Sequence, residues 1–210
     1  MVEDGAILGD GVQIGPFCIV ESGAKIGKNT VLKSNVYVNR DTVIGENNVF
    51  FHACSIGEDC QDKKYAGEKT MLYVGDNNIF REYVTLNRGT TATGSTDIGS
   101  DNLFMAYCHI AHDCKVGSNI IFANSTNIAG HVEIHDNAII GGVTAVHQFT
   151  RVGAFAMVGA CSKIVKDVLP FALTDGHPLR CVGLNRIGLR RNGFSQERIS
   201  ALKKAYRFIY

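Results

Sequence analysis

The sequence has no tryptophan, almost no net charge and no long apolar run. A net charge of +1 over 210 residues gives no case for general binding to nucleic acid. No apolar run approaches the length of a membrane span, and no charged start followed by an apolar core indicates a signal peptide. We therefore expect a cytoplasmic protein without stable membrane insertion, in which 45% hydrophobic residues supply a continuous core.

The chain does contain a repeat of six residues. A large apolar residue occupies every sixth position from Leu8 to Ile56, again from Val74 to Leu86, and then from Ile98 to Ile164. The residue four places later is usually small, and glycine often follows the apolar position, where a corner needs unusual dihedrals or the absence of a Cβ atom. A period of six fits neither the helical period of about 3.6 nor simple strand alternation. It predicts a solenoid, in which short flat sides stack coil upon coil.

Three such sides close a prism, so residues eighteen apart should lie above one another at a strand spacing of about 4.8 Å. The usual crossover rule favours a right-handed coil, so the period alone leaves the handedness open. The hexapeptide pattern resembles that of the left-handed parallel β-helix proteins, and we adopt this all-β solenoid as the predicted fold. We expect it to span residues 1–170, with loops inserted near 57–73 and 87–97, and residues 171–210 to start a helical C-terminal region.

Seven cysteines raise the question of disulfides. Cys18, Cys54, Cys108 and Cys114 occupy the small inward position of the repeat, and no C-x-x-C spacing occurs. We interpret them as reduced thiols of the core.

Five of the seven histidines lie between residues 109 and 147. Gly130 stands eighteen residues beyond His112, so a bare backbone should lie over the His112 side, with His131 beside it. An imidazole next to a free backbone N–H is the minimum for general-base attack on an acyl carbonyl with stabilisation of the oxyanion. At a corner, Asp113 can hydrogen-bond to His112 and fix its tautomer, whereas on a flat strand the two side chains point apart.

The residue pattern leaves two other interpretations of these histidines open. Any one of them, taken singly, is more typical of the polar outer face of a solenoid. Alternatively, His109, His112 and His131 imitate the zinc ligands that trimeric hexapeptide-repeat carbonic anhydrases place on neighbouring coils.

Longer motifs cover nearly the whole chain and resemble one family. They include HIAHDCKVG, NIAGHVEI and IIGGVTAVHQF in the coils, QDKKYAGE in the first loop and GLNRIGLRRNGF near the C-terminus. These motifs are similar to those of the UDP-N-acetylglucosamine O-acyltransferases, the bacterial enzymes that begin lipid A synthesis. The resemblance implies that a 3-hydroxyacyl chain passes from acyl carrier protein to the glucosamine 3-hydroxyl of UDP-N-acetylglucosamine. It also implies a homotrimer with active sites between subunits, and neither a metal ion nor another cofactor.

The resemblance assigns roles to individual residues. His112 is implied as the general base, Asp113 as its partner and Gly130 as the amide that donates to the oxyanion. His109 is implied to contact the sugar, His131 to lie near the hydroxyl of the acyl chain, and Ala160 to set the acyl length. The remaining implied substrate contacts are Gln61, Asp62 and Lys64 in the first loop, His147 and Gln148 on the nucleotide side, and Asn185 and Arg191 near the C-terminus.

The sequence departs from the family at three positions. Asn87 stands where histidine is frequent, Ile187 where members have glutamate and Asn192 where they have a second arginine, so we expect fewer nucleotide contacts. An N-acyltransferase of the same pathway shares the solenoid and the donor, and transfer to a 3-amino sugar is a further alternative; the acceptor-side motifs favour the O-acyltransferase. The chain also starts within the family's first coil and stops within its C-terminal helical region, so we expect it to be shorter than whole members.

Overall fold

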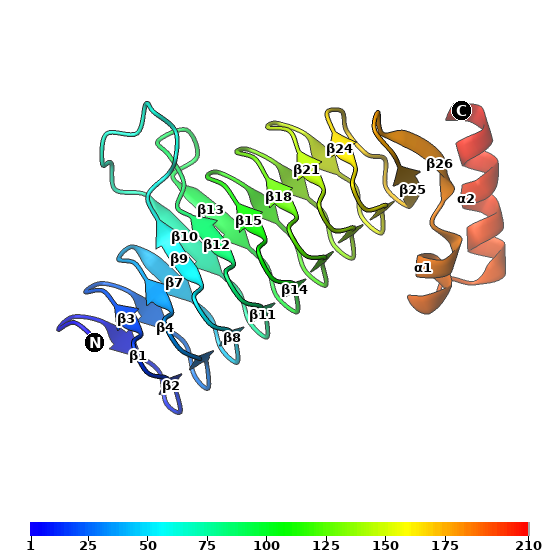
Figure 1. The fold of residues 1–210 in the computed structure, drawn as a ribbon. Helices are drawn as coiled ribbons and strands as arrows, with labels where there is room; N and C mark the ends of the chain where they lie inside the picture. Colours follow the sequence, from blue (N-terminus) through cyan, green and yellow to red (C-terminus); the bar gives the residue numbers. More distant parts are fainter. Residues whose placement is uncertain (210) are drawn as a thin grey trace.

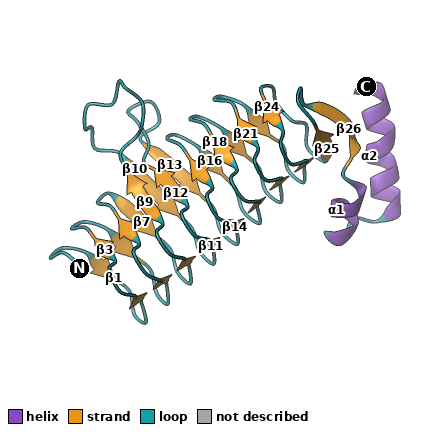
Figure 2. Ribbon diagram, viewed as in Figure 1, coloured by secondary structure: helices purple, strands orange, loops and turns teal. Residues whose placement is uncertain are grey.

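The computed structural model describes residues 1–209, in which the chain winds into a left-handed parallel β-helix with three flat faces (Figure 1). Up to β24, each face is a sheet built from every third strand, and a short turn at each corner leads to the next face (Figure 2). The predicted solenoid is therefore confirmed.

The first sheet consists of β1 (Ile7–Leu8), β4 (Lys25–Ile26), β7 (Thr42–Ile44), β10 (Met71–Val74), β13 (Ser95–Ile98), β16 (Lys115–Val116), β19 (Glu133–Ile134) and β22 (Arg151–Val152). The second sheet consists of β2 (Gln13–Ile14), β5 (Val31–Leu32), β8 (Val49–Phe50), β11 (Ile79–Phe80), β14 (Leu103–Phe104), β17 (Ile121–Phe122), β20 (Ile139–Ile140), β23 (Met157–Val158), β25 (Ala172–Asp175) and β26 (Arg180–Leu184). The third sheet consists of β3 (Ile19–Val20), β6 (Tyr37–Val38), β9 (Ser55–Glu58), β12 (Thr85–Asn87), β15 (His109–Ile110), β18 (Asn127–Ile128), β21 (Ala145–Val146) and β24 (Lys163–Ile164).

The register follows the predicted spacing of eighteen residues, as in the pairing of Lys115 with Glu133 and of Glu133 with Arg151. Where a loop is inserted, the spacing grows, and Leu72 pairs with Thr42. The coil expels the extra residues without breaking its stack. The loops span residues 59–70 and 88–94, narrower than predicted, because β9, β10, β12 and β13 extend into the expected insertions. Both leave the prism on the same side (Figure 1).

The repeated apolar side chains fill the interior. Phe50, Phe80, Phe104 and Phe122 form a column with ring centroids 4.6, 5.1 and 4.8 Å apart. Leu8 is the exception, with 41% of its surface exposed, because the first coil has a neighbour on one side only. The four cysteines at inward positions lie in this core, as predicted.

The corners show whether glycine follows the apolar position because of unusual dihedrals or because a Cβ atom would not fit. Gly27 lacks a positive φ, but a Cβ atom built there would stand 2.5 Å from the backbone of Gly45 on the next coil. At Gly27, close stacking of the turns therefore requires glycine, rather than unusual dihedrals. The left-handed conformation occurs instead two residues later, for example at Asn29 with φ 55°.

Three inward positions hold asparagine, which the repeat does not predict. Asn48, Asn78 and Asn102 are buried one above another. The Asn78 side chain donates to the Asn48 Oδ1 atom at 3.0 Å, and Asn78 Oδ1 accepts the Asn102 N–H at 2.9 Å. This ladder satisfies polar groups at one edge of the core.

The C-terminal end covers the last coil. Residues 172–184 form β25 and β26 as an antiparallel pair, so the expected helical region begins only at α1 (Arg186–Arg191) and continues with α2 (Gln196–Ile209) (Figure 2). Leu184, Leu189 and Ile199 make a second small core there. Residue 210, the end of the predicted segment, lies outside the described residues. Within residues 1–209, no helix is both long enough and apolar enough to cross a membrane.

Candidate active site

The corner that follows the third sheet carries His112 and Asp113 just after β15. Asp113 adopts the left-handed conformation with φ 60°, which aspartate tolerates better than most residues. The turn brings the neighbouring side chains together, and His112 Nδ1 lies 2.7 Å from Asp113 Oδ2, the hydrogen bond expected at a corner. Because an ionised carboxylate only accepts, this bond places a proton on Nδ1 and leaves the lone pair of neutral His112 on Nε2.

Gly130 lies one coil beyond His112 at the same corner. A Cβ atom built on Gly130 would stand 2.5 Å from Cε1 and 2.6 Å from Nε2 of His112, so only glycine leaves room for the ring. At this corner of earlier coils, the N–H groups of Ser22 and Arg40 donate to glutamate oxygens at 3.0 and 3.1 Å. A backbone amide at this corner therefore points where an anionic oxygen can accept from it, as an oxyanion donor requires.

Asp113 accepts hydrogen bonds from residues other than His112 as well. Its side chain has no exposed surface. Oδ1 accepts from the Thr90 N–H at 2.9 Å and from the Thr93 hydroxyl, while Oδ2 accepts from the Thr90 hydroxyl at 2.7 Å as well as from His112. Burial raises the pKa of Asp113, but the hydrogen bonds from Thr93, Thr90 and His112 outweigh it and lower the pKa to about 2. Asp113 is therefore ionised at neutral pH.

Two more histidines border this pair. His131 stacks on Phe149 with ring centroids 4.5 Å apart, meets the His112 ring edge to face at 5.1 Å, and places Nε2 3.7 Å from Asp113 Oδ2. His109 projects from β15 with Nδ1 2.7 Å from the Thr85 hydroxyl. Burial, with a smaller contribution from His112, lowers the pKa of His109, so it is neutral at pH 7 and suited to hydrogen-bonding a sugar hydroxyl.

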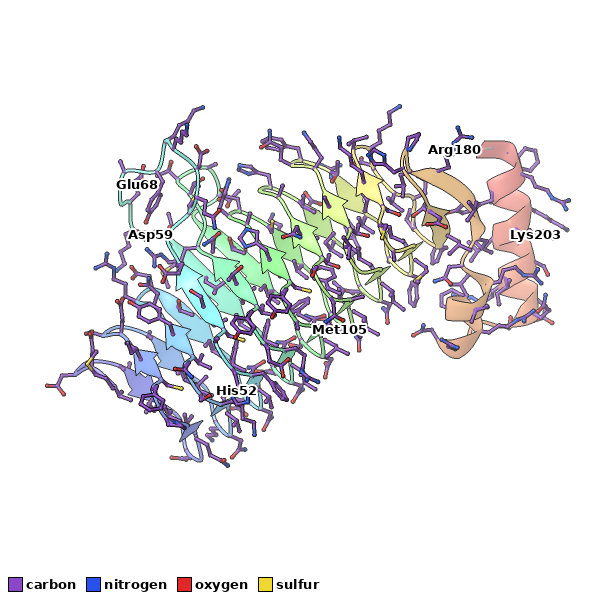
Figure 3. The ribbon with its side chains drawn as sticks, in the orientation of Figure 1. His52, Asp59, Glu68, Met105, Arg180 and Lys203 are labelled. Carbon is purple, nitrogen blue, oxygen red and sulfur yellow. The ribbon has the colours of Figure 1, made fainter. Side chains whose placement is uncertain are left out.

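Gln61, Asp62 and Lys64 are exposed on the loop 59–70. The N–H of Lys64 donates to Asp62 Oδ1 at 3.0 Å, which fixes the turn between them. The loop projects from the prism, and Figure 3 labels Asp59 and Glu68 on it. The contacts of Gln61, Asp62 and Lys64 with the acceptor stay a prediction.

The loop 59–70 is anchored by Arg88, which the sequence analysis did not single out. The Arg88 side chain is buried, and its guanidinium donates to the Gly57 carbonyl at 2.6 Å, to the Asp59 carboxylate and to the Tyr65 hydroxyl at 3.3 Å. Asn87, which replaces the frequent histidine, donates to the Asp59 carbonyl at 3.0 Å. The only sequence signal for these contacts is that Arg88 begins the second insertion, directly after Asn87.

His147 and Gln148 are exposed on the same corner as Gly130, one coil further on, with His147 Nδ1 3.1 Å from the Gln148 carbonyl. Ala160 is exposed at a different corner, on the turn after β23. A single chain therefore does not place Ala160 with His112.

Asn185 and Arg191 also lie apart from the histidines, at the C-terminal end. Asn185 is buried and caps α1, since its Oδ1 accepts the Gly188 N–H at 3.0 Å and its Nδ2 donates to the Phe155 carbonyl at 2.9 Å. Arg191 is exposed in the last turn of α1. Of the two departures there, Ile187 is 64% exposed and Asn192 ends the helix by donating to the Gly188 carbonyl at 2.9 Å.

His112, Asp113 and His131 are the described residues that come close enough to share a metal ion, with ligand atoms within 4.8 Å of one another. The zinc interpretation needed His109 instead of Asp113, but His109 turns its Nδ1 to Thr85. The His112 to Asp113 separation of 2.7 Å is a hydrogen-bond length. Two ligand atoms of one tetrahedral zinc ion lie farther apart, at about 3.3 Å. The separation of Nδ1 and Oδ2 therefore fits a hydrogen bond and does not fit two ligands of one zinc ion.

Comparison with known proteins identifies the family of this chain. A family model for bacterial transferase hexapeptides (six repeats) matches residues 5–40, and one for domain 2 of UDP N-acetylglucosamine O-acyltransferase matches residues 167–210. The acyl-[acyl-carrier-protein]–UDP-N-acetylglucosamine O-acyltransferases of Alkalilimnicola ehrlichii and Thiobacillus denitrificans are each 56% identical to the whole chain, which covers 82% of either relative. The crystal structure of LpxA from Acinetobacter baumannii superposes with a TM-score of 0.98 at 44% identity, over 100% of this chain and 82% of that one. The chain therefore belongs to the UDP-N-acetylglucosamine O-acyltransferase family.

Proposed function

We propose that His112, Asp113 and Gly130 catalyse transfer of a 3-hydroxyacyl chain from acyl carrier protein to the glucosamine 3-hydroxyl of UDP-N-acetylglucosamine, the first step of lipid A synthesis. The relatives are named for the same donor, acceptor and O-acyl transfer. The observation that supports the residue assignment is the close approach of the His112 ring to Gly130, where an added Cβ atom would stand 2.5 Å from the ring.

The reaction follows from this geometry. The sugar 3-hydroxyl attacks the thioester carbonyl carbon while His112 Nε2 takes its proton. The carbonyl oxygen becomes an oxyanion and accepts the Gly130 N–H, and Asp113 stabilises the imidazolium through Nδ1. The intermediate then expels the carrier-protein thiolate, which takes the proton back from His112. One ester forms, one thioester breaks, and the base is restored.

The substrate contacts come from three parts of the chain. We assign sugar and phosphate binding to Gln61, Asp62 and Lys64 on the loop 59–70, with His109 on the sugar and His131 near the hydroxyl of the acyl chain. His147, Gln148, Asn185 and Arg191 are assigned to the nucleotide side, where the exposed guanidinium of Arg191 can bind phosphate and the buried Asn185 orients α1.

We propose a homotrimer in which the second sheet faces a neighbouring subunit. The outward residues of this sheet are aliphatic almost throughout: Val31, Val49, Ile79, Leu103, Ile121, Ile139, Met157 and Leu173. The corner beside it exposes Phe17, Tyr83, Tyr107 and Val143. The first sheet, by contrast, turns charged residues such as Lys115, Glu133 and Arg151 outward. A continuous apolar face is typical of a permanent interface.

The placement of the site residues also favours a shared site. His112 follows the third sheet and Ala160 follows the second, so one prism turns them toward different directions. A neighbour packed on the second sheet can bring its own His112 corner toward Ala160.

Sedimentation velocity tests the trimer. Ile79→Glu places a charge on the outward face of the second sheet, where Ile79 is 40% exposed in the single chain, and should release folded, inactive monomers. Lys115→Glu makes a charge change on the first sheet and should leave the trimer intact. An active monomeric parent protein would reject the shared site.

Mass spectrometry tests the reaction. The products from UDP-N-acetylglucosamine, from its 3-amino analogue and from a panel of acyl carrier protein thioesters identify acceptor atom and acyl length together. If product formed only from the 3-amino sugar, the reaction would be N-acyl transfer and the proposed O-acyl transfer would be rejected. Because the proposed steps need only His112 and an oriented amide, activity should survive chelation, and elemental analysis should find no stoichiometric zinc. If removal of bound zinc abolished activity, the histidine cluster would have to be interpreted as a metal site.

We further propose that the enzyme works in the cytoplasm. Burial raises the pKa of the Cys54 and Cys114 thiols to about 12, which keeps these core thiols protonated and inert. A reducing compartment suits a core of unpaired thiols.

A further inference from the structure

We propose that Thr90 and Thr93, in the loop 88–94, are positioning residues for catalysis, which hold Asp113 and, through it, the His112 imidazole. The inference rests on the proposed role of His112 as the base. It assigns a function to the second inserted loop, which the reaction steps above do not use.

The two threonines supply most of the hydrogen bonds to Asp113. The Thr90 N–H and the Thr93 hydroxyl donate to Oδ1, and the Thr90 hydroxyl donates to Oδ2 at 2.7 Å. Oδ2 is the same oxygen that accepts from His112. The loop therefore fixes both ends of the carboxylate and so determines where Oδ2 lies relative to the imidazole.

The hydroxyl protons are themselves directed toward Asp113. The Ala92 N–H donates to the Thr90 hydroxyl oxygen at 3.2 Å, which uses an acceptor position and leaves the Thr90 proton for Oδ2. The Thr93 hydroxyl also lies 2.9 Å from the Ser95 carbonyl, but it has one proton, and an ionised carboxylate is the stronger acceptor.

The loop that carries these groups is closed on itself. The Gly94 N–H donates to the Thr90 carbonyl at 2.7 Å, and the Gly89 N–H donates to the Met71 carbonyl at 3.2 Å. A Cβ atom on Gly89 would stand 2.5 Å from the Ser95 backbone, so the two ends of the loop are in contact. Such a turn can hold Asp113 in one rotamer, whereas a carboxylate bound only by His112 would rotate.

Valine substitutions remove the hydroxyls while nearly keeping the shape of threonine. The double variant Thr90→Val/Thr93→Val should lose roughly 10- to 100-fold in kcat, the range known for removing the hydrogen-bond partner that orients a metal-binding side chain, because the threonines orient Asp113 in the same way. KM for UDP-N-acetylglucosamine should change little, because neither threonine is proposed to touch the sugar. Thr90→Ser and Thr93→Ser should keep most activity, since serine retains the donor.

Thr91→Val provides the matched control. Thr91 lies between the two threonines and is exposed, and within residues 1–209 its hydroxyl has no hydrogen bond to the protein. The Thr91→Val variant should have the kcat of the parent protein. Circular dichroism and sedimentation of each variant establish that the β-helix and the trimer persist.

A spectroscopic readout separates positioning from packing. In ¹⁵N NMR of histidine-labelled protein, neutral His112 of the parent should show the tautomer protonated on Nδ1, and His112→Ala identifies its signals. The double valine variant should show a mixture of tautomers. If that variant does not fold, the single valine and serine variants give the same comparison.

The outcomes distinguish this inference from the proposed function. An active His112→Ala enzyme would remove the base itself. An inactive His112→Ala enzyme together with a double valine variant that keeps both the parent kcat and the parent tautomer would reject only the positioning role. Serine variants as slow as the valine variants would likewise reject it, because the loss would then come from packing of the loop.

Discussion

Gly130→Ala tests the proposed site with the smallest possible change. The added Cβ atom would stand 2.5 Å from His112 Cε1, whereas ordinary contact begins at 3.4 Å, so the ring must move by about 0.9 Å. A shift of that size away from Asp113 would stretch the 2.7 Å bond beyond hydrogen-bond length and would move Nε2 from the position proposed for taking the sugar proton. Since φ of Gly130 is outside the left-handed region, alanine adds no backbone strain.

We expect Gly130→Ala to lose about 10²-fold in kcat, which corresponds to about 2.7 kcal/mol of transition-state stabilisation. The alanine keeps the backbone N–H, so the oxyanion donor remains and the loss acts through the base. Steady-state kinetics with acyl carrier protein thioester gives kcat, and calorimetric titration with UDP-N-acetylglucosamine should give unchanged binding. The midpoint of thermal unfolding should fall little, because the ring can move toward solvent.

The double variant His112→Ala/Gly130→Ala completes the test. If the alanine acts by displacing His112, adding it to His112→Ala should cost nothing further, because residues that act as a unit are non-additive. A Gly130→Ala enzyme with parental kcat would refute the contact between base and backbone. An equal loss from Gly130→Ala in both backgrounds would instead show that the glycine acts independently of His112.

Four further predictions concern the base and its partner, the acyl length, the phosphate contact and the stability that Asp113 contributes. His112→Ala should lose roughly 10²–10⁴-fold in kcat with sugar-nucleotide binding unchanged, and Asp113→Asn should lose less, because Asp113 orients the base without carrying the transferred proton; normal turnover by His112→Ala would move the base to another histidine. Ala160→Gly should favour longer acyl donors and Ala160→Met shorter ones in competition assays read by mass spectrometry, and an unchanged preference in both would end its role in acyl length. Arg191→Ala should raise KM for the sugar nucleotide with little change in kcat, since it removes a phosphate partner; a fall in kcat alone would contradict this. The pKa of Asp113 is lowered from 3.8 to about 2, so its stabilising contribution is present above pH 3.8 and is lost as pH falls through 2; urea unfolding of the parent and Asp113→Asn should converge in that acid range, and parallel curves would contradict the shift.

The coil could be predicted because the six-residue period determines both the length of each flat side and which residues stack on one another. Eighteen-residue register, the buried aromatic column and the small inward residues all follow from the hexads. The asparagine ladder did not follow, since Asn48 and Asn78 look like polar breaks in the pattern and only their stacking shows that they satisfy one another. The C-terminal strands did not follow either, because β25 and β26 pair as a hairpin on the last coil, outside the hexad rule.

The site was predictable where it depends on the coil. The register placed Gly130 over His112, and the corner allowed the bond to Asp113, as the structure shows. Arg88, Thr90 and Thr93 were missed because loops carry no period, and a buried arginine looks like any surface charge in a sequence. One signal was available: Arg88 begins an insertion at the coil directly below His112, since Thr85 pairs with His109.

The solenoid holds the proposed base and the proposed oxyanion donor of this enzyme at a separation that the fold itself sets. His112 and Gly130 are one coil apart, and the coils are locked by the ladder bonds from Ala111 N–H to the Ile128 carbonyl at 3.0 Å and from His131 N–H to the His112 carbonyl at 3.1 Å. Neither group has to be brought in by a mobile segment, so the hydrogen-bond donor is oriented before the acyl group arrives, which is the condition for electrostatic stabilisation without reorganisation. The inserted loops add groups that a regular coil lacks. The loop 88–94 hydrogen-bonds to the carboxylate of Asp113, and the loop 59–70 carries the residues that we propose to contact the acceptor. On this proposal, the coil spacing sets the distance between the base and the oxyanion donor, while the inserted loops orient the base and bind the acceptor.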